Sequence, residues 1–213
     1  MINFENRRVL ILAPHTDDAE LGMGGTIARM QREGAVITVI AFSSADESLP
    51  PGFEKGTTRA EFSESMRLYQ VDGFDVLNFK VREFPRDRQA LLEELIKIRK
   101  DVAPDIIFCP ASEDVHQDHK TVYQETLRAF RLCSILGYEL PWNCFNLRAN
   151  FFIHINEQDF QKKLESIQLY KSQLAKESIY LNETFLTSQL QQNGARLGRN
   201  GLFEAFEVIR IIN

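Results

Sequence analysis

Two short polar segments hold most of the residues in this sequence that are able to bind a metal ion or transfer a proton. The first is PHTDDAE, residues 14–20, and the second is EDVHQDH, residues 113–119. Together they contain three of the chain's four histidines. Imidazole and carboxylate groups suit Zn²⁺ or Fe²⁺, and three such ligands with one water form an open, catalytic metal site.

His15 and Asp18, together with one of the two downstream histidines, would supply such a three-ligand set. One histidine and one or two aspartates then remain to act as a base and a hydrogen-bond donor, which metal-assisted hydrolysis requires. Taken singly, each segment is also compatible with a solvated turn or a capped helix. The hydrolase interpretation therefore depends on whether the fold brings the two segments together.

The rest of the sequence alternates between short apolar runs and longer amphipathic stretches. The runs predict strands at residues 9–13, 36–42, 75–79, 105–109, 150–155 and 204–212, and the stretches predict helices at 24–32, 57–69, 88–102, 119–136 and 157–171. Strands that alternate with helices in this way form right-handed βαβ units and a mostly parallel sheet.

This pattern predicts an α/β fold: a single domain over residues 1–213 with a doubly wound, Rossmann-like sheet and helices on both faces. The first five strands of such a sheet take the order 3-2-1-4-5, with the run at 150–155 as the fifth strand here. Strands 1 and 4 are then neighbours, and ligands bind in the crevice at their carboxyl ends. The two polar segments follow these strands closely, so we expect them to face each other.

The overall composition argues against several other classes of protein. Lys and Arg number 25 against 30 Asp and Glu, which gives a net charge of −5 and makes a dedicated nucleic-acid binder improbable. The sequence has no apolar run long enough for a transmembrane helix, and its N-terminus lacks the features of a signal peptide. Three cysteines without a C-x-x-C pair favour a reducing, cytoplasmic location. A homo-oligomer is compatible with this composition.

Two longer motifs resemble the signatures of the PIG-L-like (LmbE-like) zinc-dependent N-acetylglucosamine deacetylases. PHTDDAELGMGG, residues 14–25, resembles A-H-P-D-D-E…G-x-G-G, and HQDH, residues 116–119, resembles H-P-D-H. Weaker similarities follow in order along the chain: RAEF (59–62) to R-x-E, YKSQ (170–173) to H-x-S-Q, and GLFEAF (201–206) to G-x-Y-A-E-A-F. Thr16 and Gln117 stand where the family usually has proline, but neither is a ligand position.

The resemblance implies a metal-dependent hydrolase that removes the acetyl group from an acetamido sugar, giving acetate and a free amino sugar. His15, Asp18 and His119 would be the zinc ligands, with Fe²⁺ as another possible metal. Asp17 would be the general base that deprotonates the zinc-bound water.

The same resemblance assigns three further roles. A protonated His116 would stabilise the oxyanion and donate a proton to the leaving amine. Asp118 would orient His116 and raise its pKa. Arg59 would lie near the sugar or the acetate product.

Two alternatives stay open on the sequence alone. An amidase acting on a larger sugar–thiol conjugate would use the same chemistry with a different pocket. A nucleotide-binding module is suggested by Gly22, Gly24 and Gly25 and by Asp46 after the second strand, although the spacing is not G-x-G-x-x-G and the nearby acids would repel a pyrophosphate.

The roles of four other features are not decided by the sequence. Trp142 suits either packing or stacking on a sugar, and residues 43–56 suit either an active-site lid or plain surface. The basic loop at 194–201 suits either a phosphate clamp or a solvated turn, and His154 either an edge-strand residue or a substrate contact.

Overall fold

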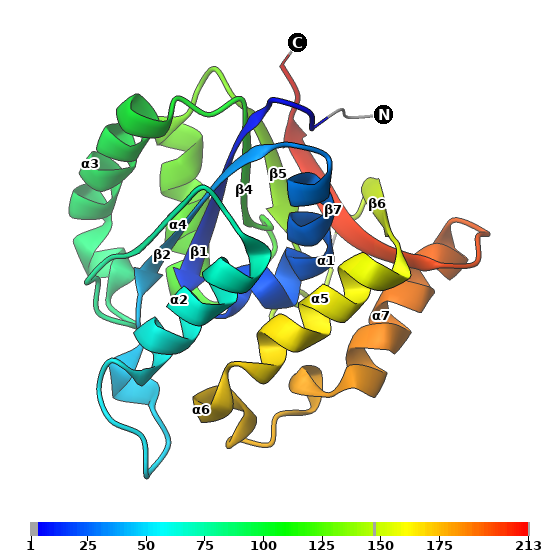
Figure 1. Ribbon diagram of the computed structural model, residues 1–213. Coiled ribbons are helices and arrows are strands. Elements are labelled where there is room, and N and C mark those ends of the chain that lie inside the picture. Colours follow the sequence, from blue (N-terminus) through cyan, green and yellow to red (C-terminus); the bar gives the residue numbers. More distant parts are fainter. Residues whose placement is uncertain (1–3, 147, 213) are drawn as a thin grey trace.

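A twisted sheet runs through the centre of the molecule and carries helices on both faces (Figure 1). The computed structural model describes residues 4–146 and 148–212. Within these residues the strands are β1 (Arg8–His15), β2 (Val36–Ser43), β3 (Gly73–Val76), β4 (Ile106–Pro110), β5 (Ser134–Tyr138), β6 (Phe151–Ile155) and β7 (Leu202–Arg210). The helices are α1 (Asp18–Arg32), α2 (Thr57–Tyr69), α3 (Phe84–Val102), α4 (Gln117–Ala129), α5 (Glu157–Gln168), α6 (Lys171–Leu174) and α7 (Glu183–Arg196), with short 3-10 helices η1 (Asp46–Ser48) and η2 (Ile179–Leu181).

The strand order is β3-β2-β1-β4-β5-β7-β6. The pairs among β1 to β5 are parallel, whereas β7 runs antiparallel to both of its neighbours. The predicted α/β class, the mostly parallel sheet and the direct pairing of the first and fourth strands are confirmed.

The predicted position of the fifth strand was wrong. The strand beside β4 is Ser134–Tyr138, which falls at the end of the helix predicted over 119–136; that helix ends at Ala129. The run at 150–155 forms β6 at the sheet edge, antiparallel to β7. All five residues of β5 are buried, and a short, fully buried run cannot be told from the tail of a helix by its periodicity.

The side chains of β1 point alternately into two apolar cores, one on each face of the sheet, as expected for a strand at the centre of the sheet. Val9, Ile11 and Ala13 pack into the core beneath α1, α2, α5 and α7. Leu10 and Leu12 pack into the second core, beneath α3 and α4 on the opposite face. Successive side chains of a strand point to opposite faces, so a continuous apolar run is the pattern of a strand covered on both sides. Helices on both faces, as predicted, are visible in Figure 1.

Helix α1 begins six residues before the predicted start at Gly24, and it breaks at Met23, whose backbone is not helical (φ −151°, ψ 24°). The Glu204 carboxylate on β7 accepts hydrogen bonds from the N–H groups of Gly25 and Thr26, at 3.1 and 2.6 Å. These are the N–H groups that the break frees from the helical ladder. The second part of α1 is therefore capped from a strand almost 180 residues away.

Two observations bear on the classes that the composition excluded. None of the helices in residues 4–146 and 148–212 is long and apolar enough to cross a membrane. The three cysteines are buried and free of disulfide bonds.

Candidate functional site

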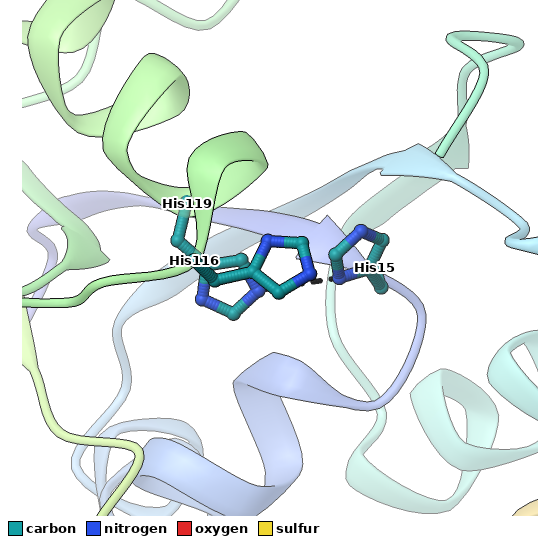
Figure 2. A group of neighbouring side chains, drawn as sticks. All are labelled: His15, His116 and His119. Carbon is teal, nitrogen blue, oxygen red and sulfur yellow. Dashed lines mark hydrogen bonds between the residues drawn. The ribbon is translucent and has the colours of Figure 1, made fainter. Parts of the chain in front are cut away.

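The two polar segments meet at the carboxyl ends of β1 and β4 (Figure 2). His15 is the last residue of β1, and Asp18 is the first residue of α1. His116 caps the N-terminus of α4, and His119 lies in the first turn of that helix. Because β1 and β4 pair directly, side chains 104 positions apart in the chain come into contact.

Three side-chain atoms form a nearly equilateral triangle: His15 Nδ1, Asp18 Oδ2 and His119 Nε2. The Asp18 oxygen lies 3.2 Å from His15 Nδ1 and 3.3 Å from His119 Nε2, and the two ring nitrogens are 3.2 Å apart. A tetrahedral cation with bonds of about 2.0–2.2 Å holds its ligand atoms about 3.3–3.6 Å apart. The triangle therefore fits one divalent cation, and two imidazoles with one carboxylate suit Zn²⁺ or Fe²⁺.

His116 contributes no atom to this triangle, although a ring nitrogen of each of the three histidines lies within 4.8 Å of the others. The main-chain N–H of Asp118 donates to His116 Nδ1 at 3.2 Å, so this nitrogen holds no proton. Burial, with the charges of His119 and His15, lowers the pKa of His116. The structure therefore presents His116 as a neutral ring with its proton on Nε2, in place of the protonated ring expected from the sequence.

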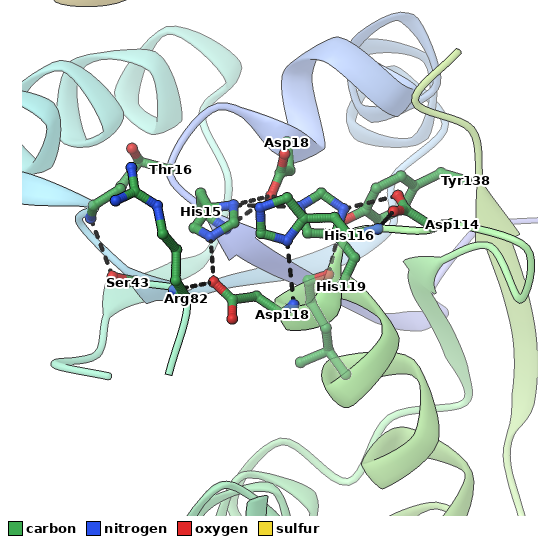
Figure 3. A network of polar contacts seen from close by, with 12 residues as sticks. His15, Thr16, Asp18, Ser43, Arg82, Asp114, His116, Asp118, His119 and Tyr138 are labelled. Carbon is green, nitrogen blue, oxygen red and sulfur yellow. Dashed lines mark hydrogen bonds and ion pairs between the residues drawn. The ribbon is translucent and has the colours of Figure 1, made fainter. Parts of the chain in front are cut away.

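The sequence led us to expect that the Asp118 carboxylate faces His116, but in the structure it faces His15. Its Oδ2 lies 3.1 Å from His15 Nε2 and accepts a 2.6 Å hydrogen bond from the main-chain N–H of Arg82 (Figure 3). Asp118 contacts His116 only through its own main-chain N–H. A carboxylate on the second ring nitrogen fixes the tautomer of a metal-binding histidine, so Asp118 orients His15.

Asp114 holds His119 in the same way, a role that the sequence did not reveal. Its Oδ2 lies 2.8 Å from His119 Nδ1, and its Oδ1 accepts a 2.9 Å hydrogen bond from the main-chain N–H of His116. Each of the two imidazoles of the triangle thus has a carboxylate behind it (Figure 3). The spacing D-x-H-x-D-H was the available signal, but nothing in it shows which acid contacts which histidine.

The charges at this site push the pKa values of neighbouring groups apart. Burial alone would lower the pKa of His15, but its hydrogen bonds to Asp118 and Asp18 raise it to about 10. Despite burial, the positive charges of His119 and His15 lower the pKa of Asp18 to about 2. Burial and the Asp18 carboxylate raise the pKa of Asp17 to about 6. Two adjacent aspartates with opposite shifts are suited to two roles, one as a ligand and one as a base.

A cavity of about 290 Å³ opens beside the triangle. The loops that follow β1, β2, β3 and β5, together with the start of α4 and the segment around α6, supply its walls. Its lining comprises His15, Thr16, Asp17, Asp18, Leu21, Ala45, Ser48, Val81, Arg82, His116, His119, Trp142, Asn143, Gln173, Lys176 and Tyr180. The three predicted ligands therefore share one concave site with Asp17 and His116.

Arg59 is the predicted site residue that the structure does not bring to this cavity. Its guanidinium donates to the carbonyl oxygens of Val76 and Leu77 and to Asn78 Oδ1, at 2.5, 3.4 and 2.9 Å. It lines a separate depression beside β3. Three acceptors at the end of β3 compete with any substrate for its donors, so Arg59 ties α2 to β3.

Two of the weaker motifs, at 59–62 and 170–173, contact each other, and the second supports the loop that carries Asp17. The Glu61 carboxylate accepts hydrogen bonds from the Ser172 N–H at 2.8 Å and from its hydroxyl at 2.5 Å. The Tyr170 hydroxyl contacts the Thr16 carbonyl and lies 2.6 Å from Glu20 Oε1. These contacts fix the backbone on either side of the cavity.

The glycines of the first motif face the protein interior. A Cβ at Gly22 would lie 2.5 Å from the Tyr138 ring, and one at Gly25 would lie 2.7 Å from the Ile155 side chain. These positions let α1 pack closely on the sheet, and the helix N-terminus that a nucleotide would need is occupied by Asp17 and Asp18. The structure gives the nucleotide-binding alternative no support.

The features left undecided by the sequence fall into two groups. Trp142 lines the cavity and stacks on Tyr180, and the loop after β2 contributes Ala45 and Ser48 to its wall. His154 lies exposed on edge strand β6, away from the cavity, and the 194–201 segment forms the end of α7 and a turn before β7.

Comparisons with known proteins show which family the chain belongs to. Residues 10–130, more than half of the chain, match the PIG-L family, described as GlcNAc-PI de-N-acetylase. The sequence is 26% identical over 177 residues to YaiS of Escherichia coli (strain K12), described as an uncharacterized deacetylase; the match covers 81% of this chain and 96% of that protein. It is 23% identical over 202 residues to the diacetylchitobiose deacetylase of Thermococcus kodakarensis, covering 84% of this chain and 75% of that protein.

A solved structure shows the same fold. The N,N'-diacetylchitobiose deacetylase from Pyrococcus horikoshii, in complex with its inhibitor MPG, superposes with a TM-score of 0.82 at 22% identity, covering 97% of this chain and 85% of that one. The matched region of the sequence includes both polar segments that form the site. The chain belongs to the PIG-L family of deacetylases.

Proposed function

We propose that this protein is a zinc-dependent N-deacetylase that hydrolyses an acetamido sugar to acetate and a free amino sugar. The observation that carries the proposal is the triangle of His15, Asp18 and His119 with Asp17 and His116 beside it in one cavity. His15, Asp18 and His119 would hold the cation. When bound, the cation supplies Lewis acidity toward the amide oxygen and toward a water molecule.

Asp17 is the residue best suited to act as the base. It lines the cavity next to Asp18, and its carboxylate makes no capping hydrogen bond at the start of α1. Burial and the Asp18 charge raise its pKa to about 6, near the range in which a general base works well at neutral pH, and a bound cation would lower this value. Asp17 would take a proton from the water that attacks the acetyl carbon.

The neutral His116 is suited to donate a hydrogen bond to the oxygen that gains negative charge. Its Nδ1 is occupied by the Asp118 N–H, so only Nε2–H is available to the substrate. A neutral imidazole that gave up this proton would become an anion, so proton delivery falls to another group. The protonated Asp17 would return its proton to the amine nitrogen as the C–N bond breaks.

The size of the cavity supports a small sugar substrate. Its volume of about 290 Å³ is just below the roughly 300–1,000 Å³ that small-molecule sites occupy. One pyranose ring with its acetamido group suits this volume better than the larger sugar–thiol conjugate considered above.

The test is acetate release by the zinc-loaded protein and its Asp17→Asn variant. N-acetylglucosamine and diacetylchitobiose serve as the first substrates. We expect Asp17→Asn to retain zinc, measured by atomic absorption, and to lose about 10²–10⁴-fold in kcat, because a positioned general base contributes this factor.

Asp87→Asn is the matched control, since Asp87 lies on α3 outside the cavity and pairs with Arg86. It should keep both zinc and activity. Undiminished acetate release by Asp17→Asn would disprove the assigned base, and no acetate from any acetamido sugar would disprove the proposed function.

A further inference from the structure

The lining of the cavity includes two cationic side chains that form no ion pair among the residues the structure describes. Arg82, in the loop between β3 and α3, and Lys176, just after α6, both line the cavity. Within the described part of the chain, neither forms an ion pair: the Arg82 guanidinium donates to Ser48 Oγ at 3.0 Å, and Lys176 Nζ donates to Gln173 Oε1 at 2.7 Å. Most other exposed cations on the neighbouring α3, such as Arg86, Arg88 and Lys97, are paired with carboxylates.

The conformation of Arg82 shows that its position is held by the site. Its φ is +70°, which is unusual for a bulky residue other than glycine. This conformation directs its main-chain N–H to Asp118 Oδ2, the oxygen that also contacts His15. The Arg82 backbone therefore supports a metal ligand, while its guanidinium donates a hydrogen bond to Ser48 on the loop after β2.

Lys176 lies in the segment after α6, far along the chain from Arg82, and lines the same cavity. Asp17 also lines this cavity, and the positive charge of Lys176 opposes the rise in the pKa of the Asp17 carboxyl. Its one hydrogen bond, to an uncharged amide, leaves the ammonium group able to bind an anion.

An aromatic pair completes the mouth. Trp142 and Tyr180 stack with their ring centroids 3.9 Å apart and their planes 20° from parallel, and both line the cavity. Two stacked rings are stiffer than one, and aromatic surface suits the apolar face of a sugar ring. Ser48, Asn143 and Gln173 supply uncharged donors and acceptors for sugar hydroxyls.

We infer that the preferred substrate is an acetamido sugar bearing an anionic group, a phosphate or a carboxylate, which Arg82 and Lys176 bind while the sugar ring lies against Trp142 and Tyr180. This inference rests on the proposed deacetylase function and adds to it the substrate's charge. Of the two acids of the cavity, Asp18 contacts both His15 and His119, whereas the exposed Arg82 and Lys176 form no ion pair among the described residues. An uncharged sugar leaves both charges unused.

The experiment compares kcat/KM for four sugars: neutral N-acetylglucosamine, its 1-phosphate, its 6-phosphate, and N-acetylmuramic acid, which carries a carboxylate. We expect at least one anionic sugar to exceed the neutral one by about 10-fold or more, since hydrogen bonds between charged groups are worth this factor. The anionic sugar that shows the preference identifies the group and its position on the ring.

Arg82→Gln and Lys176→Gln should each lower the ratio of anionic to neutral kcat/KM by about 10-fold. Arg82→Lys should restore part of the ratio. Lys80→Gln is the matched control: it removes the same charge two residues from Arg82, from a side chain paired with Glu83 and outside the cavity. Its ratio should stay at the wild-type value.

Equal kcat/KM for all four sugars in the wild type, or an equal fall for charged and neutral sugars in Arg82→Gln, would overturn the inference. The second result would mean that the substitution acts by disturbing the loop whose main chain contacts Asp118, and that the guanidinium does not bind the anion. Calorimetric binding of the same sugars to zinc-loaded Asp17→Asn separates the two proposals. Arg82-dependent binding of an anionic sugar without acetate release by the wild type would contradict the deacetylase function alone, and acetate release without charge preference would contradict this inference alone.

Discussion

Two clusters of buried charge lie along α1, one at its start and one at its break, and they differ in how their charges are balanced. At the break, Glu204 Oε1 accepts from Lys163 Nζ at 2.7 Å, and its two oxygens also accept the Gly25 and Thr26 N–H groups. Lys163 donates a further hydrogen bond to the Leu21 carbonyl at 2.9 Å. Every charge of this cluster has a permanent partner in the protein.

At the start of α1 the acids outnumber the permanent cations. Asp18 faces two histidines that carry charge only when protonated, and Asp17 lies next to it and forms no ion pair within the described part of the chain. The buried Asp118 Oδ1 has no hydrogen-bond partner among the described residues. A buried polar atom without a partner is costly, and a strained arrangement of charge commonly marks a functional site. Similar residue types are therefore structural where a buried lysine pairs with the carboxylate, and suited to binding a cation where no such ion pair forms.

The largest predicted effect follows from changing an acid to its amide at the break of α1. Glu204→Gln should destabilise the protein by about 3–5 kcal/mol, because it leaves the Lys163 ammonium buried without a counter-charge. Urea unfolding of the metal-free protein measures this change. In the same assay Asp18→Asn should cost much less, while binding of zinc is lost.

The double variant Lys163→Met/Glu204→Gln controls for the loss of the carboxylate itself. It should be less destabilised than the sum of the two single variants, since no unpaired charge remains. If Asp18→Asn proved as destabilising as Glu204→Gln, the distinction between the two clusters would be wrong.

An intermediate effect is expected from the carboxylates behind the histidines. Asp118→Asn and Asp114→Asn should each weaken zinc binding by about 10–100-fold, because such outer carboxylates orient the ligand and increase its basicity. Titration against a fluorescent chelator measures the affinity, and Asp87→Asn should leave it unchanged. Loss of activity with wild-type zinc affinity would instead place these residues in substrate binding.

The smallest expected effect is on the pH dependence of stability. Because the pKa of Asp17 is raised from 3.8 to about 6, the folded metal-free state binds this proton more tightly than the unfolded state does. Its contribution to stability therefore falls as pH rises from about 4 to 6, and it stays low above that range. Metal-free Asp17→Asn should be more stable than the wild type at pH 7 by about 1–2 kcal/mol.

Thermal unfolding with and without zinc checks this prediction. The gain should disappear when zinc is bound, since the cation stabilises the ionised Asp17. A variant that is less stable than the wild type at pH 7 in the absence of metal would show that Asp17 is not under electrostatic strain.

The sequence by itself determined which residues follow the two central strands, and the strand order usual in doubly wound sheets predicted that those strands are neighbours. The apolar runs at 9–13 and 105–109 are covered on both faces, and only a parallel strand in the middle of a sheet needs such a pattern. Since His15 and the HQDH segment follow these runs closely, local residue order placed both at the carboxyl ends of their strands, where the pairing of β1 with β4 brings them together.

Only the tertiary structure decided which partners these residues have. Asp118 contacts His15 instead of His116, Asp114 contacts His119, and Arg59 binds the end of β3 instead of lining the cavity. The fifth strand was also decided by pairing, because residues 134–138 become a strand through hydrogen bonds to β4 and β7. The spacing of apolar residues along the chain indicates which residues are buried. The direction of a polar side chain depends instead on the groups that distant segments bring beside it.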